Sequence, residues 1–270
     1  MEDVTVAAVC MHSEPGQVDE NLGATGRFVA EAAGKGADII CFPELSLTGY
    51  SLARDEGDRC SLSLPVAESL LTRLARDSGA AVIAGFAEEA GGGKPFITQV
   101  AVGPEGFIGV HRKSHLGPPE RDVYRAGDAI DTFSFGGTVS GIQLCYETHF
   151  PEISTTMAVG GAEVLFFPHA SPRGSGEEKL ENWLRHLPAR AFDNGVFVVA
   201  CNQVGKTAAG FSFPGVAVVI GPDGRIEASY AGEDEEILVV RLQSRKLLNV
   251  RKNRMKYFLP NRRPSLYKPA

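Results

Sequence analysis

The chain has 270 residues and carries a formal net charge of −6, from 27 Lys and Arg against 33 Asp and Glu. This acidic balance, with no basic stretch ahead of the C-terminal tail, argues against nucleic acid as a partner. No apolar run approaches the roughly 20 residues needed to cross a bilayer, so we predict no membrane partner.

The first half of the chain alternates short apolar, β-rich runs with amphipathic helical patterns. Gly79 follows the second helical pattern and is expected to end it, because glycine readily adopts the left-handed conformation found at helix C-termini. The predicted strands are residues 4–11, 37–42, 80–86, 97–102 and 107–112, and the predicted helices are residues 19–34 and 65–78.

The second half repeats this rhythm, with strands at residues 138–144, 163–168, 196–201, 216–220, 225–229 and 236–240, and helices at residues 151–159 and 178–192. Helices of this kind cover one face of a sheet, and the other face must also be covered. Two such sheets packed on each other satisfy both requirements. No low-complexity linker divides the chain, so we predict a single α/β domain over residues 1–270.

Three chemically active side chains stand at the ends of predicted strands, namely Glu44, Lys113 and Cys145. Taken singly, each has a plain alternative: a solvated loop carboxylate, a surface base and a buried structural thiol. Taken together they suit nucleophilic catalysis. The carboxylate would accept the thiol proton, the thiolate would attack a carbon bearing nitrogen, and the ammonium would stabilise the developing oxyanion.

The residues around these three positions carry a recognisable pattern. The segments are Cys-Phe-Pro-Glu-Leu-x-Leu-Thr-Gly-Tyr at 41–50, Arg-Lys-x-His-Leu at 112–116 and Leu-Cys-Tyr-Glu-x-x-Phe-Pro-Glu at 144–152. In this order they resemble the Glu-Lys-Cys motifs of the nitrilase superfamily of carbon–nitrogen hydrolases, and residues 189–195 and 202–205 also look like segments of that family. The resemblance implies a four-layer αββα sandwich, an acyl-enzyme thioester on Cys145, and no metal or other cofactor.

Several further residues are expected near the triad. The resemblance implies a second catalytic glutamate, which Glu120 would supply from a loop rich in Gly and Pro, and it makes Glu147 a structural carboxylate that supports the nucleophile loop. The backbone N–H of Tyr146 is a candidate second oxyanion donor. The predicted substrate-binding residues are Tyr50, Tyr146, His149 and His169. The plain alternative for the two histidines is an exposed or hydrogen-bonded position in a loop.

The histidines and cysteines do not predict a metal site or disulfides. His111 and His115 lie four residues apart on an extended segment, which spans roughly 13 Å and is too far for one ion to bridge. The five cysteines are odd in number and lack CxxC spacing, which suits a reducing compartment. The acidic start Met1-Glu2-Asp3 lacks the basic region of a signal peptide, so we expect a cytoplasmic location.

The residues that follow Cys145 bear on the substrate. Tyr146 stands where nitrilases carry Trp, which resembles amidase branches and predicts hydrolysis of a small aliphatic amide to a carboxylate and ammonia. No Arg occupies the next three positions, as it often does in branches that act on N-carbamoyl amino acids, and Arg173 is the candidate that would take its place. Short uncharged amides are therefore the expected substrates. N-carbamoyl hydrolysis, nitrile hydrolysis and a catalytically silent role in binding or assembly stay as alternatives.

The C-terminal stretch, residues 241–270, is rich in Lys and Arg and has Tyr257, Phe258 and Leu259 embedded in it. A solvated basic tail is the plain interpretation. The apolar insert and three prolines, Pro260, Pro264 and Pro269, instead favour an ordered, extended arm that docks on another acidic subunit. We therefore predict a homodimer or a higher homo-oligomer, and binding of this tail to a membrane or to nucleic acid is the weaker alternative.

Overall fold

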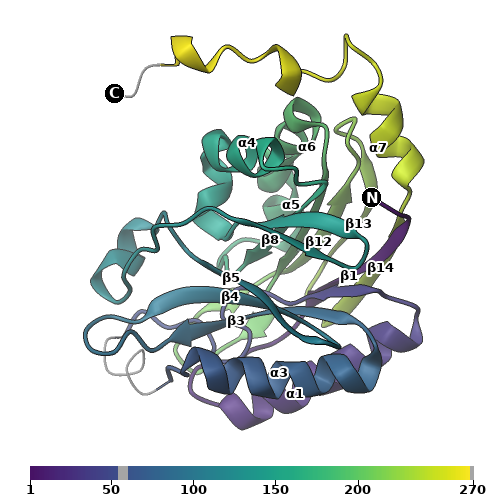
Figure 1. The fold of residues 1–270 in the computed structure, drawn as a ribbon. Coiled ribbons are helices and arrows are strands. Elements are labelled where there is room, and N and C mark those ends of the chain that lie inside the picture. Colours follow the sequence, from purple (N-terminus) through teal and green to yellow (C-terminus); the bar gives the residue numbers. More distant parts are fainter. Residues whose placement is uncertain (54–59, 268–270) are drawn as a thin grey trace.

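Two six-stranded sheets pack face to face and carry helices on their outer faces, as Figure 1 shows for the computed structural model. The structure describes residues 1–53 and 60–267. From bottom to top of the view, the helices α1 and α3, the two sheets, and the helices α4 and α6 follow one another. The four-layer αββα arrangement predicted for the chain is confirmed. None of the helices in the described ranges is long and apolar enough to cross a membrane.

The first sheet has the strand order β14-β1-β2-β3-β4-β5. Its centre is parallel, from β1 through β2 to β3, and its outer pairs are antiparallel. Phe28 of α1 and Leu71 of α3 pack against its outer face, to which Val82 of β3 and Val100 of β4 contribute. The elements are β1 (Val4–Cys10), α1 (Val18–Gly34), β2 (Ile39–Cys41), α3 (Leu64–Ser78), β3 (Ala81–Glu88), β4 (Phe96–Gly103), β5 (Gly106–Arg112) and β14 (Glu236–Leu242).

The second sheet has the order β13-β12-β9-β8-β7-β6, with the three strands β7, β8 and β9 parallel. Its outer face packs under helices α4 to α6 through Met157, Phe167 and Trp183. The elements are β6 (Thr132–Phe135), β7 (Thr138–Ile142), α4 (Pro151–Val159), β8 (Val164–His169), α5 (Gly176–Leu184), α6 (Leu187–Asn194), β9 (Phe197–Asn202), β12 (Gly215–Ile220) and β13 (Ile226–Gly232), with a short hairpin of β10 (Gly205–Lys206) and β11 (Ser212–Phe213) beside it.

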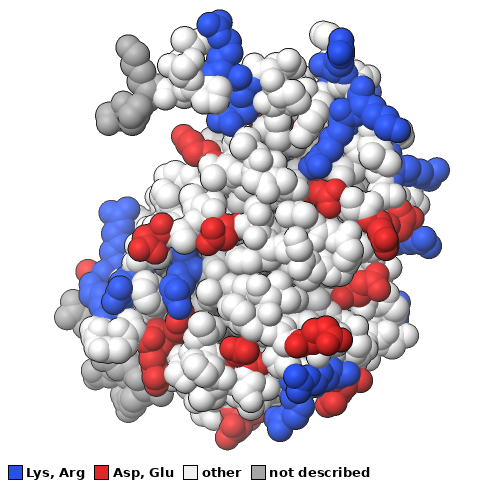
Figure 2. Space-filling model, viewed as in Figure 1, with Lys and Arg blue, Asp and Glu red and all other residues white. Residues whose placement is uncertain are grey.

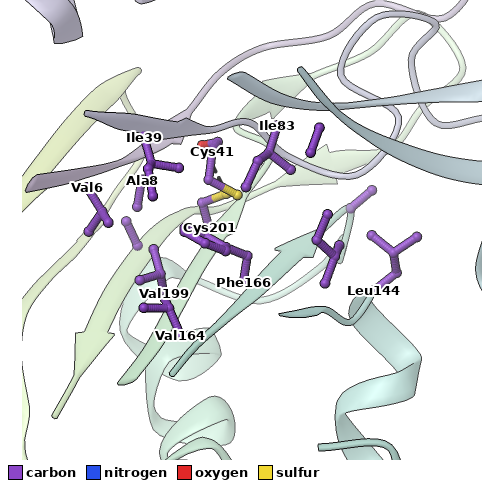
Figure 3. Close-up of a cluster of buried hydrophobic side chains, with 14 of the residues drawn as sticks. Val6, Ala8, Ile39, Cys41, Ile83, Leu144, Val164, Phe166, Val199 and Cys201 are labelled. Carbon is purple, nitrogen blue, oxygen red and sulfur yellow. Dashed lines mark hydrogen bonds between the residues drawn. The ribbon is translucent and has the colours of Figure 1, made fainter. Parts of the chain in front are cut away.

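The space between the sheets is filled by apolar side chains that range in size from Ala to Phe (Figure 3). Ile39 and Cys41 of β2 face Phe166 of β8 and Cys201 of β9, all fully buried. The Cys201 thiol lies 3.6 Å from the carbonyl oxygen of Cys41. Each such buried apolar side chain contributes roughly 1.5–3 kcal/mol. This core fixes the two sheets relative to each other, and so fixes the strand ends that carry the site.

Two of the sequence predictions need correction. The helix expected over 178–192 is two helices, α5 and α6, because Pro188 stands in the first turn of α6 and cannot donate a hydrogen bond back into a preceding helix. The C-terminal arm is not extended throughout, since residues Ser244–Arg251 form the helix α7. Two short 3₁₀ turns follow it, at Leu259–Asn261 and Pro264–Leu266.

The first part of the C-terminal segment packs on its own chain. Arg251 donates a 2.7 Å hydrogen bond to the carbonyl oxygen of Ala162, and the ring of Phe258 lies 5.6 Å from that of Phe192. Three apolar side chains of the same segment, Met255, Leu266 and Tyr267, are nevertheless exposed. Lys and Arg side chains gather over this segment at the top of Figure 2. Pro269 lies outside the described residues.

Candidate active site

Three strand ends meet at one edge of the molecule and bring the predicted triad together. Glu44 follows β2 and Lys113 follows β5, both in the first sheet, while Cys145 follows β7 in the second. Within each sheet these strands point the same way, so their carboxyl ends lie on the same side. This edge is where open α/β sheets usually bind ligands.

Lys113 is fully buried and holds two carboxylates. Its ammonium donates hydrogen bonds of 2.7 Å to Oε1 of Glu44 and of 2.7 Å to Oε1 of Glu120. Burial lowers the pKa of Lys113, but the negative charges of Glu44, of the Cys145 thiolate when it forms and of Glu120 outweigh burial and raise that pKa well above its ordinary value. Lys113 is therefore a fixed positive charge at the centre of the site.

Glu44 is fully buried, and hydrogen bonds hold both its side chain and its backbone. Its Oε2 accepts a 3.0 Å hydrogen bond from the backbone N–H of Ala170, and its carbonyl oxygen accepts one of 2.8 Å from the side chain of Gln203. Burial raises the pKa of Glu44 to about 7, although the charge of Lys113 opposes the shift. A carboxylate whose pKa lies near neutral pH is well suited to take up and return protons.

Glu120 is buried, in the 3₁₀ helix Pro118–Asp122. Its second carboxylate oxygen accepts a 2.6 Å hydrogen bond from the backbone N–H of Gly117. The Gly/Pro-rich loop thus brings this second glutamate into contact with the ammonium that also holds Glu44.

Cys145 has an unusual backbone conformation, with φ at +38°, which side chains other than Gly rarely adopt. It opens the short 3₁₀ helix Cys145–His149 directly after β7, and it is partly exposed. Burial and the negative charge of Glu44 raise the pKa of the thiol, while Lys113 and the Ala170 N–H oppose the shift. The group therefore rests as a thiol and must lose its proton during attack.

Glu147 supports the turn that carries Cys145. Its Oε2 accepts a 2.6 Å hydrogen bond from the backbone N–H of Leu144 and lies 2.8 Å from Nε2 of His111. Its Oε1 accepts bonds of 2.7 and 2.5 Å from the backbone and hydroxyl of Ser114. Burial raises the pKa of Glu147, but His111 and these hydrogen bonds outweigh burial and lower it to about 2. Within the described residues, no group of three His, Cys, Asp or Glu side chains could hold a metal ion.

A cavity of about 550 Å³ opens beside the nucleophile. Tyr146, His149 and His169, three of the predicted substrate-binding residues, line it with Cys145. The full lining is Cys145, Tyr146, Thr148, His149, His169, Ser171, Lys179, Asn182, Trp183, Arg185 and His186.

Comparison with known proteins identifies the family of this chain. The model of the carbon-nitrogen hydrolase family matches residues 5–252. The chain belongs to the carbon–nitrogen hydrolase family. It is 30% identical to a protein named nitrilase from Pyrococcus abyssi, over 98% of this chain and 99% of that one. It is 29% identical to N-carbamoylputrescine amidase from Arabidopsis thaliana, over 93% and 90% of the two chains.

A solved amidase structure from Nesterenkonia sp. AN1 superposes on this hydrolase with a TM-score of 0.83, at 25% identity, over 97% of this chain and 95% of that one. That structure is of a mutant in which the acetamide moiety of fluoroacetamide is added covalently at the active-site cysteine. The recognition of the superfamily from the three motifs is confirmed.

Tyr50, a predicted substrate-binding residue, and Arg173, the alternative clamp, are not among the described residues that line this cavity. Tyr50 is buried with its ring 5.4 Å from that of Phe211, and burial and the charge of Glu120 raise its pKa. It adjoins the triad but is not among the residues that line the cavity in the described chain, so its contact with substrate stays a prediction. Arg173, the possible substitute clamp, is exposed and also stands outside that lining.

One wall of the cavity consists of residues that the sequence analysis did not assign to the site. It comes from α5 and the residue pair after it, with Lys179, Asn182, Trp183 and His186. The ring of Trp183 lies 4.1 Å from that of His169, which joins this wall to the end of β8. The four residues have the spacing i, i+3, i+4, i+7, which places side chains on one face of a helix. That spacing is the signal in the sequence, but it is the same signal that a core-facing helix gives.

Proposed function

We propose that this hydrolase cleaves the C–N bond of a small amide and releases ammonia and a carboxylate, with Cys145 as nucleophile. The observation that carries the proposal is the buried cluster of Lys113 with Glu44 and Glu120 together with Cys145, which lines a cavity. A base whose pKa is near neutral pH, a fixed cation and a thiol in one site are the parts that acyl transfer needs.

In the first half of the proposed reaction Glu44 takes the proton of the Cys145 thiol while the sulfur attacks the amide carbonyl carbon. The ammonium of Lys113 and the backbone N–H of Tyr146 stabilise the oxyanion of the tetrahedral intermediate. Glu44 then gives the proton to the leaving nitrogen, the C–N bond breaks, ammonia departs, and the acyl group stays on sulfur as a thioester.

In the second half Glu44 takes a proton from water, which attacks the thioester carbon. The C–S bond breaks, the thiolate recovers the proton, and the carboxylic acid leaves. Glu120 contacts the same ammonium as Glu44, and we propose that it holds Lys113 in place and keeps a second negative charge there as the proton moves on and off Glu44.

The covalent step can be tested by intact mass. A slowly hydrolysed amide should leave one acyl adduct per chain, and the Cys145→Ala variant should carry none. The Cys201→Ala variant is the matched control, because that thiol is fully buried in the core between the sheets and should leave adduct formation intact. An adduct that maps to Cys41 or Cys201 would refute the nucleophile assignment.

The three proteins compared above bear the names nitrilase, N-carbamoylputrescine amidase and amidase. We place this chain with the amidases because Tyr146 follows the nucleophile and lines the cavity. The test is kcat/KM for an amide, a nitrile and an N-carbamoyl compound that share one carbon skeleton, because this ratio reports differential transition-state binding. A nitrile or carbamoyl compound that outpaces the amide would overturn the amidase assignment. Absence of turnover on all three would favour a role in binding or assembly.

We also propose that the hydrolase acts in the cytoplasm as a homodimer or larger homo-oligomer, with the C-terminal segment in the contact. Exposed apolar side chains among basic ones support the subunit contact, and Met255 is 84% exposed. The buried free thiols of Cys10, Cys41 and Cys201 suit a reducing compartment such as the cytoplasm. Light scattering on the full chain and on a chain that ends at Asn253 tests the contact. An unchanged mass after truncation would contradict it.

A further inference from the structure

The fixed charges on the wall of the active-site cavity are all positive. Lys179 and Arg185 line it, and within the part of the chain that the structure describes no Asp or Glu does so. This is unusual in a chain whose net charge is −6. An uncharged substrate gives no reason to place a partly buried ammonium in such a wall, because burying it costs solvation energy.

The ammonium of Lys179 is held in a defined place. It donates hydrogen bonds of 2.8 Å to the hydroxyl of Ser171 and of 2.9 Å to the carbonyl oxygen of Pro172. An ammonium has three N–H donors, so one stays available. Burial and the charge of Arg173 lower the pKa of Lys179, and the negative charge of the Cys145 thiolate acts in the opposite direction. Lys179 and Cys145 line the same cavity.

The other titratable groups around the cavity do not compensate this cation. Burial lowers the pKa of His149, and burial lowers the pKa of His186 to about 4, with Arg190 adding to both shifts. Both rings are therefore neutral at pH 7. Glu44 and Glu120 are already engaged by Lys113.

Arg185 is less well placed than Lys179. Its side chain is mostly exposed and lies 3.5 Å from that of Glu181, which is also exposed. A mobile surface pair of this kind contributes little. Lys179 is therefore the cation in this wall whose position is fixed and whose charge is left without a carboxylate partner in the described chain.

We propose that the substrate is a small amide that carries a carboxylate at its other end, and that Lys179 binds this carboxylate while Cys145 attacks the amide. The inference rests on the amide hydrolysis proposed above and revises the expectation that uncharged amides are the best substrates. From the sequence alone, Arg173 is the candidate residue that would hold a substrate carboxylate. We assign this role to Lys179 of helix α5 instead.

The charge preference is tested with three amides of similar size. Succinamate carries the carboxylate, 4-methylpentanamide is its uncharged shape analogue, and 4-aminobutanamide carries a positive charge instead. We expect kcat/KM to be about tenfold to a hundredfold higher for succinamate than for 4-methylpentanamide, as one hydrogen bond to a charged group would give. We expect the cationic amide to be the slowest. Equal values for succinamate and 4-methylpentanamide would overturn the inference and leave amide hydrolysis standing.

The residue is tested with Lys179→Met, which keeps the length of the side chain and removes its charge. The ratio of kcat/KM for succinamate to that for 4-methylpentanamide should fall about tenfold to a hundredfold, and Lys179→Arg should keep most of it. Arg173→Met is the matched control, since this cation on the adjacent loop is exposed and does not line the cavity, and it should leave the ratio unchanged. An unchanged ratio in Lys179→Met, or a fall only in Arg173→Met, would overturn the assignment.

Binding without turnover separates this inference from the proposed reaction. In a Cys145→Ala background, calorimetry should give a Kd for succinamate that weakens about tenfold or more when Lys179→Met is added. Lys179-dependent binding without ammonia release from the parental protein would support the anion site and refute the hydrolysis. Binding that is the same with and without Lys179 would refute the anion site alone.

Discussion

Nε2 of His111 lies 2.8 Å from Oε2 of Glu147, and this fully buried contact ties the two sheets together behind the nucleophile. His111 belongs to β5 of the first sheet, and Glu147 belongs to the turn after β7 of the second. Glu147 also accepts hydrogen bonds from the backbone N–H groups of Leu144 and Ser114. One carboxylate therefore aligns the loop of Cys145 with the loop of Lys113.

We expect Glu147→Gln to destabilise the fold by about 2–4 kcal/mol, although the two side chains have nearly the same size. An amide presents one NH2 where the carboxylate accepts hydrogen bonds on both oxygens, so one buried donor is left facing another. Urea unfolding measures the loss. Glu105→Gln, at an exposed turn, is the control and should stay within about 0.5 kcal/mol. A Glu147→Gln midpoint equal to that of the control would contradict the structural role.

The pH dependence of activity should follow Glu44. The base must be ionised to accept the thiol proton, and burial raises its pKa to about 7 from its ordinary value of 4.5. For an uncharged amide, we therefore expect kcat/KM to rise as the pH increases through about 7 and then to level off. Burial is the largest cause of this shift, and Lys113 and Glu120 are the charged neighbours that also act on the pKa of Glu44. A rate that is flat from pH 5.5 to 8 would rule out Glu44 as a base with a raised pKa.

The same shift predicts a pH dependence of stability. The folded state holds the Glu44 proton more tightly than the unfolded state, so this group's favourable contribution is fully present below the ordinary pKa of 4.5 and is lost as the pH rises through about 7. Removal of the charge by Glu44→Gln should therefore raise the thermal midpoint relative to the parent more at pH 8 than at pH 5, while activity is lost. A difference in midpoint that does not change with pH would contradict the raised pKa.

Lys113→Arg should not rescue the function of the ammonium. Lys113 is fully buried between two carboxylates, with both contacts at 2.7 Å, and a wide planar guanidinium does not fit the place of a compact ammonium. We expect kcat to fall about a hundredfold to a thousandfold, the usual effect of losing an oxyanion donor. Lys252→Arg, at an exposed position after α7, should leave kcat unchanged. Near-parental turnover of Lys113→Arg would move this lysine out of the reaction.

The sequence predicts those parts of the molecule that local patterns determine. Apolar runs mark the strands, and the charged residues that end them, Glu44 and Lys113, are the ones that the structure brings into contact. The break between α5 and α6 also has a local signal, Pro188. The position of Lys179 in the cavity wall depends instead on packing between segments far apart in the chain. Helix α7 was missed because a basic stretch with few apolar residues gives a weak helical pattern. Its Leu247 and Val250 are nevertheless buried.

Gly85 offers a test of how closely the fold positions the base. It lies in β3 directly against the loop of Glu44, and a Cβ at this position would come within 2.5 Å of the backbone nitrogen of Leu45 and 2.4 Å of the side-chain oxygen of Gln99. Gly85 also binds this loop through its backbone, with its carbonyl oxygen 2.8 Å from the N–H of Leu47.

We therefore expect Gly85→Ala to push the Glu44 loop away from Lys113 and to lower kcat by about a hundredfold, because a shift of 1 Å in a reacting group can cost that much. Gly23→Ala is the matched control: Gly23 lies in α1 with open space around it, where alanine should stabilise the helix by up to about 1 kcal/mol. The measurements are kcat and the thermal midpoint of both variants. A Gly85→Ala enzyme with parental kcat would mean that the loop can move without disturbing the base.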